Sequence, residues 1–270
     1  MIRNYLSKKQ IDDYQNLGVI IIKDVFKEWI EPLRIGFQKV LDKPSKHGRE
    51  NVEDKNKGRF FEDYCNWKRI DEFRDCIFNS PGAQIVAEAT SSKLIKIFHD
   101  HIFIKEAETN KKTPWHQDMP YYCVDGNDTG SFWIPLDNVD KENNLKLILK
   151  SHKWPKLVRP TKWFNNEPWY KDETSFMDLP KIEDFQKSIL IPELNLGDAV
   201  LFNFKIVHSS SGNSTSESRR AFSMRFIGDD VRYIDRGGAT SPPFERINLK
   251  SGDFMREDWF PKIFNKQYIL

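Results

Sequence analysis

His116 and Asp118 lie two residues apart in the stretch TPWHQDMPYY, residues 113–122. On an extended strand, side chains two residues apart point to the same face. An imidazole nitrogen and a carboxylate oxygen can then bind one cation from a single strand end, which is two thirds of the 2-His-1-carboxylate set that holds Fe(II). The spacing favours a strand that ends at a metal site, and it predicts that a distant histidine completes the ligand set.

The stretch of residues 197–220 contains such a histidine. Its sequence predicts a turn at Gly197, then one apolar strand over residues 199–207, then His208 and a turn rich in Ser, Gly and Asn. An arginine pair opens the next apolar strand. Because a guanidinium group can pair with a carboxylate through two parallel hydrogen bonds, an arginine at this place suits a dicarboxylic co-substrate.

Either of two adjacent arginines, Arg219 or Arg220, could make that pair. Side chains alternate along a strand, so Arg219 shares a face with Ser223 and Arg225, whereas Arg220 points to the opposite face. We expect Arg219 to point into the site and Arg220 to point away from it, with Arg220 as the competing assignment.

Four segments of the chain resemble the phytanoyl-CoA dioxygenase family of Fe(II)/2-oxoglutarate-dependent oxygenases. They are IFHDHIFIKEA (97–107), TPWHQDMPYY (113–122), SFWIPLDNVDKENNLKLILKSHK (131–153) and GDAVLFNFKIVHSSSGNSTSESRRAF (197–222). The resemblance implies a mainly β fold with accessory helices, a double-stranded β-helix of the cupin-like jelly-roll type. One departure is that Lys150, Ser151 and His152 stand where family members commonly have Gly-Ser-His, which concerns a turn and not the metal site.

The resemblance also implies the roles of four residues and the cofactors. Fe(II) is expected on His116, Asp118 and His208, with Arg219 on the distal carboxylate of 2-oxoglutarate and O2 as the third reactant. It implies oxidative decarboxylation of 2-oxoglutarate to succinate and CO2 with hydroxylation of an unactivated substrate C–H. Halogenating relatives carry a small residue at the carboxylate position, so Asp118 favours hydroxylation.

Further co-substrate contacts are expected from side chains near these residues. Thr113 and Ser210 are positioned to donate hydroxyl hydrogen bonds, and Ser131 and Trp133 share a strand face that can line the site. On the strand of residues 93–107, Lys105 points inward with His99, His101 and Phe103 and can reach a carboxylate; the alternative is a surface lysine.

The substrate candidates are Trp115, Tyr121, Tyr122 and Phe103 as aromatic walls, and Arg225 as a partner for an anionic group. The alternative for Arg225 is a surface ion pair at a strand end. Nothing in the sequence resembles a phosphate loop for CoA, which favours a small free metabolite over a CoA ester.

Two other functions compete with the oxygenase. His99, His101 and Glu106 resemble a cupin metal motif, which would suit a non-oxygenase isomerase or hydrolase. However, the motif lacks its flanking glycine and a matching second motif downstream. A protein that senses 2-oxoglutarate without turnover is the other alternative, against which the complete ligand set argues.

We expect one domain over residues 1–270. A support region of helices and strands covers residues 1–92, and the catalytic β core covers residues 93–228. An insertion rich in aromatic residues lies inside that core at residues 153–188, and a surface tail covers residues 229–270. The insertion is interpreted as a lid over the iron, or alternatively as a segment that its aromatic residues pin to the scaffold. Helices are expected near residues 8–17, 28–41 and 81–89, and a polar loop over residues 42–59.

Charge and composition limit the partners. With a net charge of +2 and 30% charged residues, the chain shows no sign of nucleic-acid binding. It has no apolar run long enough for a membrane span, and no signal-peptide core at its N-terminus, which predicts a cytoplasmic protein. Three cysteines without metal-type spacing are expected to be reduced thiols. The oligomeric state is not predictable from these features.

Overall fold

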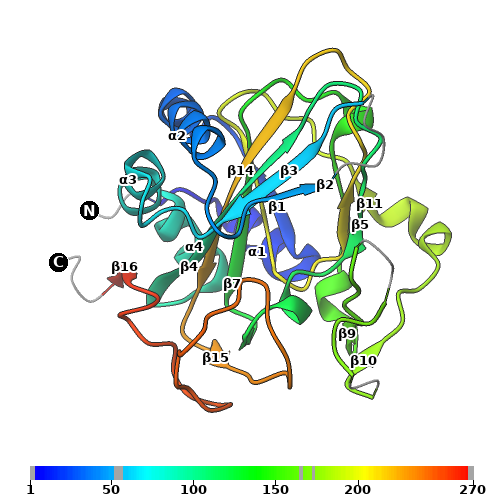
Figure 1. Cartoon of the computed structure of the whole chain (residues 1–270). Helices are drawn as coiled ribbons and strands as arrows, with labels where there is room; N and C mark the ends of the chain where they lie inside the picture. The colour runs from blue at the N-terminus through cyan, green and yellow to red at the C-terminus, as the bar shows by residue number, and fades with distance from the viewer. Residues whose placement is uncertain (1–3, 52–56, 164–166, 172–173, 267–270) are drawn as a thin grey trace.

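Two antiparallel β-sheets face each other across a cavity, and four helices lie outside the larger sheet (Figure 1). The computed structural model describes residues 4–51, 57–163, 167–171 and 174–266. The helices are α1 (Lys8–Leu17), α2 (Ile30–Asp42), α3 (Asp71–Asn79) and α4 (Gly82–Thr90). Short 3₁₀ turns are η1 (Lys27–Trp29), η2 (Met119–Tyr121), η3 (Lys141–Asn143), η4 (Ser151–Lys153) and η5 (Ile182–Ser188).

The large sheet has the strand order β1-β12-β7-β14-β4-β3-β2, with β16 also paired to β4. Its strands are β1 (Val19–Ile22), β2 (Arg49–Asn51), β3 (Phe60–Tyr64), β4 (Leu94–Lys105), β7 (Thr129–Pro135), β12 (Ala199–Phe202), β14 (Arg219–Ile227) and β16 (Lys262–Asn265). The small sheet has the order β11-β8-β13-β5, formed by β5 (Thr113–His116), β8 (Leu145–Ile148), β11 (Ile189–Leu190) and β13 (His208–Ser210). Two further strand pairs are β6 (Val124–Asp125) with β15 (Arg232–Tyr233), and β9 (Leu157–Val158) with β10 (Phe176–Met177).

The first helix begins and ends where its sequence predicts. The Ser7 hydroxyl accepts a hydrogen bond from the Gln10 backbone N–H at 3.2 Å, and the Gln10 side chain accepts one from the Ser7 N–H at 3.0 Å. Gly18 ends the helix in the left-handed conformation (φ 80°), which glycine adopts without a steric penalty. The chain then enters β1 at the edge of the large sheet.

One face of the large sheet packs against the helices and forms the main core. Apolar side chains of β4 and β14, such as Ile102 and Phe222, contact buried residues of α2, α3 and α4, such as Phe37, Phe73 and Ile85. Strand alternation then turns the intervening side chains of β4 and β14 toward the opposite face. That opposite face lines the cavity.

The single strand expected over residues 199–207 was wrong, because the chain changes sheets there. The strand β12 ends at Phe202 in the large sheet, and a turn follows in which the Ile206 N–H donates to the Asn203 carbonyl at 2.9 Å. The next strand, β13, begins at His208 in the small sheet. This change of sheet brings His208 opposite His116 on β5.

Two further segments differ from expectation. The polar loop expected over residues 42–59 contains the short strand β2, and its residues 52–56 lie outside the described part of the chain. The C-terminal tail adds β16 to the large sheet, and its residues Ser241 and Pro242 reach the cavity. Cys65, Cys76 and Cys123 are free thiols, as expected. In the residues that the structure describes, no helix is both long and apolar enough to span a membrane.

Candidate active site

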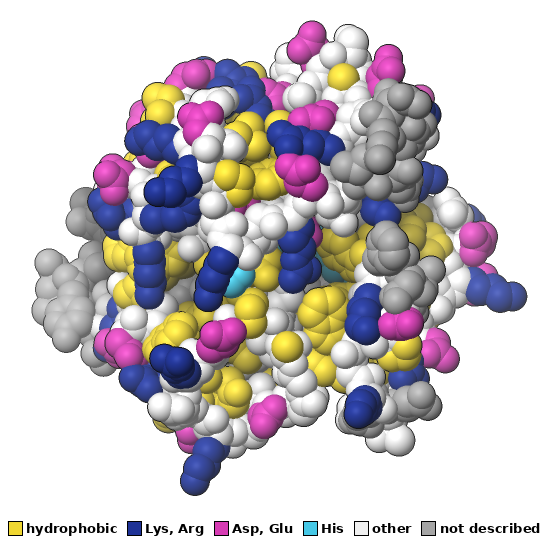
Figure 2. All heavy atoms as spheres, in the orientation of Figure 1, with side chains coloured by type: hydrophobic (Ala, Val, Ile, Leu, Met, Phe, Trp, Pro, Cys, Tyr) yellow, Lys and Arg dark blue, Asp and Glu magenta, His cyan; other side chains and the backbone are white. Residues whose placement is uncertain are grey.

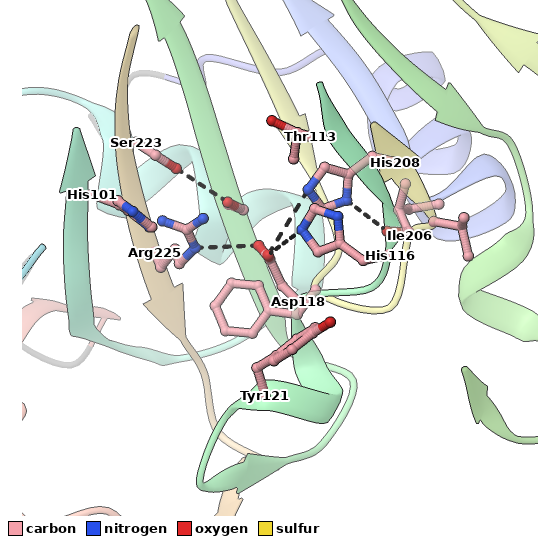
Figure 3. A network of polar contacts seen from close by, with 12 residues as sticks. His101, Thr113, His116, Asp118, Tyr121, Ile206, His208, Ser223 and Arg225 are labelled. Carbon is pink, nitrogen blue, oxygen red and sulfur yellow. Dashed lines mark hydrogen bonds and ion pairs between the residues drawn. The ribbon is translucent and has the colours of Figure 1, made fainter. Parts of the chain in front are cut away.

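Three side chains of the expected ligand set converge at one end of the cavity (Figure 3). The Nε2 atoms of His116 and His208 lie 3.6 Å and 3.9 Å from Asp118 Oδ1, and the two imidazole rings are 4.3 Å apart. The ligand atoms all lie within 4.8 Å of one another, and all three residues are buried. The spacing allows one metal ion to contact all three.

The backbone fixes the orientation of both imidazoles. His116 Nδ1 lies 2.8 Å from the Pro114 carbonyl, and His208 Nδ1 lies 2.9 Å from the Ile206 carbonyl. A carbonyl oxygen only accepts, so each Nδ1 carries the proton and each Nε2 lone pair is free for a metal ion. Burial and the charge of His116 lower the pKa of His208 to about 3. Neutral imidazole is the form that binds metal.

Asp118 reaches the site from a turn, so the expectation that it shares an extended strand with His116 was wrong. β5 ends at His116, and Asp118 has helical backbone angles (φ −73°, ψ −45°) at the start of η2. The Phe204 carbonyl accepts hydrogen bonds from the N–H groups of Asp118 and Met119, both at 3.0 Å. The turns that carry Asp118 and His208 are thereby joined.

Gln117 also joins these turns, and it points away from the site. Its amide nitrogen donates to the Lys205 carbonyl at 2.6 Å, and its amide oxygen accepts from the Val158 N–H at 2.8 Å. Gln117 therefore holds the turn before His208 and the beginning of the insertion in place.

Arg225 binds the carboxylate oxygen of Asp118 that faces away from the histidines. Its Nε lies 3.2 Å from Asp118 Oδ2, and both side chains are buried. Burial opposes ionisation of Asp118, but the Arg225 guanidinium and the imidazoles outweigh it and hold the pKa of the carboxyl well below its usual range. Arg225 also lines the cavity, and its Nη1 has no hydrogen-bond partner among the described residues, so the expected contact with an anionic substrate stays a prediction.

A second group of cavity residues carries uncompensated positive charge. Lys105 and Arg219 stand opposite each other on β4 and β14, and they are only 1% and 6% exposed. Among the described residues, the Arg219 guanidinium has no acidic partner, and its Nη1 has no hydrogen-bond partner. Burial and the charge of Arg219 hold the pKa of Lys105 well below its usual range. Two adjacent buried cations that form no ion pair with an acid among the described residues favour an anionic ligand.

Two hydroxyl groups accompany these cations. Lys105 Nζ donates to Ser210 Oγ at 3.0 Å and to the Ser211 carbonyl at 2.6 Å, while Ser210 Oγ donates to Thr113 Oγ1 at 3.1 Å. Thr113 and Ser210 both line the cavity, as does Trp133. Ser131 is not among the lining residues; its hydroxyl lies 3.4 Å from Ser223 Oγ behind the cavity wall.

Arg220 points away from the cavity, as strand alternation predicts. Its guanidinium pairs with Asp137, with Nε 2.9 Å from Oδ2 and Nη2 2.6 Å from Oδ1. Arg219, Ser223 and Arg225 line the cavity on the other face. The competing assignment of Arg220 to a co-substrate therefore has no geometric support.

The cavity has a volume of about 360 Å³. Figure 2 shows histidine side chains in a hollow of the surface, between apolar side chains and Lys and Arg side chains. Three of the aromatic candidates, Phe103, Tyr121 and Tyr122, line it. Trp115 does not; it packs beside Ile148 and other apolar residues of the small sheet, so its expected contact with substrate was wrong.

The aromatic insertion reaches the metal ligands through Tyr121. The Tyr121 hydroxyl donates to the Thr161 carbonyl at 2.9 Å and accepts from the Trp163 Nε1 at 3.3 Å. The Trp163 ring lies 4.9 Å from the His116 ring, edge to face. Residues 164–166 and 172–173 of the insertion lie outside the described part of the chain.

The rival metal motif is not assembled. Glu106 binds Arg59 with a distance of 2.7 Å, and it does not line the cavity. His99 and His101 do line it, with ring centres 6.4 Å apart, but in the described residues the metal-type cluster found is that of His116, Asp118 and His208.

Strands β2 and β3 form a cavity wall that the sequence did not predict. Arg49, Asn51, Phe60, Glu62 and Tyr64 line it. All five residues of β3 are buried, so its sequence FFEDY lacks the apolar–polar alternation by which half-buried strands are recognised.

Comparison with protein families identifies the class. The family described as "Phytanoyl-CoA dioxygenase (PhyH)" matches residues 14–221. The chain belongs to the phytanoyl-CoA dioxygenase family. This membership makes it an enzyme of the 2-oxoglutarate-dependent dioxygenase class, and the cupin-like jelly-roll fold expected from the sequence is confirmed.

Relatives and solved structures that resemble this protein extend over most of the chain. The peroxisomal phytanoyl-CoA dioxygenase of Rattus norvegicus is 23% identical over 275 residues, which cover 90% of this chain and 75% of the rat protein. The structure of the epimerase SnoN with Fe3+, alpha ketoglutarate and nogalamycin RO has a TM-score of 0.74 at 18% identity and covers 95% of this chain and 98% of SnoN. That of EctD from S. alaskensis with 2-oxoglutarate and 5-hydroxyectoine has a TM-score of 0.65 at 16% identity and covers 83% and 76%.

Proposed function

We propose that the protein is an Fe(II)/2-oxoglutarate-dependent hydroxylase of a small molecule. One observation carries the proposal: a buried His-Asp-His triad and a buried pair of uncompensated cations open into the same cavity. In this proposal Fe(II) binds to His116, Asp118 and His208. Two neutral nitrogens and one ionised carboxylate oxygen suit this ion, and three ligands on one side leave positions open.

The co-substrate is proposed to lie between the triad and the cation pair. The distal carboxylate of 2-oxoglutarate would pair with Arg219, with Lys105, Thr113 and Ser210 supplying further hydrogen bonds. A carboxylate there replaces the repulsion between Lys105 and Arg219 with two attractive contacts, which supports an anion at this position. The solved structures of SnoN and EctD, whose ligands include alpha ketoglutarate or 2-oxoglutarate, support the same choice.

Bound iron supplies O2 activation coupled to oxidation of 2-oxoglutarate to succinate and CO2, and the protein's own residues position the reactants. Arg225 keeps Asp118 ionised and oriented. Asp118 itself occupies the ligand position that a halide would need, which favours hydroxylation of a C–H bond. The insertion is proposed as a lid, because Trp163 and Tyr121 cover one side of His116.

A small free metabolite remains our proposed substrate class. The cavity holds about 360 Å³ and is lined by aromatic side chains, among them Phe103, Tyr122 and Trp169. Such a lining encloses a compact apolar body well. The small molecules bound in the SnoN and EctD structures agree with this class.

Anaerobic titration of the reconstituted protein with Fe(II) and 2-oxoglutarate tests the cofactors. We expect the weak visible charge-transfer band of chelated 2-oxoglutarate, its loss in His116→Ala, and its loss at low co-substrate in Arg219→Ala. Succinate release under O2 then reports turnover. An iron-loaded protein without the band would support a metal cupin, and a band without succinate release for any substrate would support a sensing protein.

A further inference from the structure

Four side chains on β3 and β4 line a part of the cavity where the proposed function assigns no metal or co-substrate contact. Glu62 and Tyr64 on β3, with His99 and His101 on β4, all line the cavity. Glu62, Tyr64 and His99 are buried and His101 is half-buried, and in the described part of the chain Tyr64 Oη and His99 Nδ1 have no hydrogen-bond partner. Buried polar atoms without partners are rare in proteins, and in a cavity they indicate contacts that a ligand completes.

Glu62 is the acidic residue among these four side chains. Its side chain is 9% exposed to solvent and lines the cavity. Within the described residues its polar contact is with His101, whose Nε2 lies 3.4 Å from Glu62 Oε2. Burial opposes ionisation of Glu62, but the contact with His101 and the charge of Arg49 outweigh it and lower its pKa. The carboxylate is therefore ionised.

The neighbouring cations do not neutralise this carboxylate directly. Burial lowers the pKa of His101, so its imidazole is neutral at physiological pH. Lys105 on the next strand donates to Ser210 and Ser211. Arg49 stands opposite Glu62 in the β2–β3 pair, but it is exposed and forms no ion pair with Glu62. Within the described residues Glu62 thus forms no ion pair with Lys105 or Arg49, although its charge raises the pKa of Lys105.

Aromatic side chains flank Glu62 on β3 and β4. Phe103 stands opposite Glu62 in the β3–β4 pair and stacks on His101 at 4.0 Å. Tyr64, two residues along β3, lies 5.3 Å from the His101 ring. A carboxylate bordered by aromatic rings is a favourable environment for an ammonium group, because the ring faces attract a cation and the carboxylate balances its charge.

We propose that Glu62, with the rings of Tyr64 and Phe103, forms a subsite for a cationic amine or quaternary ammonium group of the substrate. The inference deepens the proposed function and rests on it, since it assigns a charge to the substrate of the same cavity. It also gives the cavity polarity: the anionic co-substrate is attracted to the Arg219 end and repelled from Glu62, and the substrate cation experiences the reverse.

Matched probes of different charge test the subsite. The protein is loaded with Zn(II), which is redox-inert, and with 2-oxoglutarate. Binding of benzyltrimethylammonium, benzyl alcohol and benzenesulfonate is then compared by ligand-observed NMR. We expect the ammonium probe to bind most tightly. Glu62→Gln, which keeps the shape of the side chain, should weaken ammonium binding at least about fivefold, in line with loss of an ion pair beside aromatic rings.

Two further variants separate the subsite from general surface charge. Arg49→Gln removes the like charge at the rim and should strengthen ammonium binding. Glu50 is an exposed acid on β2, beside Arg49, and it binds Arg59. Glu50→Gln should leave ammonium binding unchanged. The inference is overturned if the ammonium probe binds no better than the sulfonate to protein that holds 2-oxoglutarate, or if Glu62→Gln leaves its affinity unchanged. Failure to bind 2-oxoglutarate would instead contradict the proposed function, and the charge preference is then measured in the zinc-loaded protein alone.

Discussion

The two sheets that enclose the cavity contribute different chemistry to it. The small sheet supplies the two histidines from strands of three and four residues that pair directly, His208 opposite His116. The large sheet supplies charged groups from the long strands β4 and β14, with Lys105 opposite Arg219 and with Arg225 opposite His99, which burial keeps neutral. Short strands that end in turns let ligands converge on one point, whereas long paired strands fix charges in rows.

This difference separates two tasks. The turns after β5 and before β13 are joined by hydrogen bonds from Asp118 and Met119 to Phe204, so the metal ligands are held locally. The charges of the large sheet are held by a ladder that extends through the core, and their spacing follows the strand register. We therefore expect changes in the small sheet to affect metal binding first and changes in the large sheet to affect anion binding first.

The largest effect is expected at Asp118. Asp118→Ala removes a proposed metal ligand. Loss of a residue that only contacts a metal ligand lowers metal affinity by up to about 100-fold, so loss of the ligand itself should lower iron affinity by more than that. Iron content after dialysis against a chelator measures it. Asp137→Ala, which removes a carboxylate that binds Arg220 outside the cavity, should retain iron. Equal iron content in both variants would contradict the assignment.

Arg219 should determine co-substrate affinity with little effect on iron. Truncating one partner of a buried charge pair costs about 2–5 kcal/mol, so Arg219→Ala should raise the 2-oxoglutarate Kd by about 30-fold or more. Calorimetric titration of the metal-loaded protein measures the Kd. Arg220→Ala serves as the control, since its guanidinium is bound to Asp137. A larger effect in the control would reverse the assignment of the two arginines.

Arg225 is an exception to the division between a metal-binding small sheet and an anion-binding large sheet, because it belongs to the large sheet and contacts a proposed metal ligand. Arg225→Met leaves Asp118 Oδ2 without its ion pair, and we expect iron affinity to fall by about 10–100-fold, as for other outer contacts of metal ligands. Chelator competition measures the loss, and partial recovery in Arg225→Lys would show that charge is required. Unchanged iron affinity would confine metal binding to the small sheet.

The smallest effect is proton uptake by Lys105. Burial and the charge of Arg219 lower its pKa in the free protein, so it loses its proton at a lower pH than an exposed lysine does. A carboxylate beside it raises that pKa, and 2-oxoglutarate binding should therefore take up protons. Calorimetry in two buffers of different ionisation enthalpy measures this uptake, which should disappear in Lys105→Met. Persistence of the uptake in that variant would assign it to another group.

The sequence predicted the elements whose signals are local. The Ser7–Gln10 capping box and Gly18 defined α1, and strand alternation placed Arg219 inward and Arg220 outward. Both rest on interactions between residues near in sequence, and tertiary packing does not override them.

Long-range features were missed for physical reasons. The turn at Asp118 depends on the Phe204 carbonyl, and the break after Phe202 depends on pairing with another sheet, so neither appears in the local pattern. Glu62 lies in a strand with both faces covered, where alternation is absent. The displacement of Trp115 from the cavity follows from packing of the small sheet beside Ile148.

Gln117 has a consequence for engineering of the insertion. The Gln117 side chain forms hydrogen bonds with the Lys205 carbonyl and with the Val158 N–H, so it attaches the first residues of the insertion to the turns that carry the metal ligands. A loop exchange that begins after Val158 leaves both hydrogen bonds in place, and one that begins at Lys153 replaces the residue whose N–H donates the second bond. The part of the insertion that can be exchanged without disturbing the metal-binding turns therefore begins after Val158, several residues inside the segment.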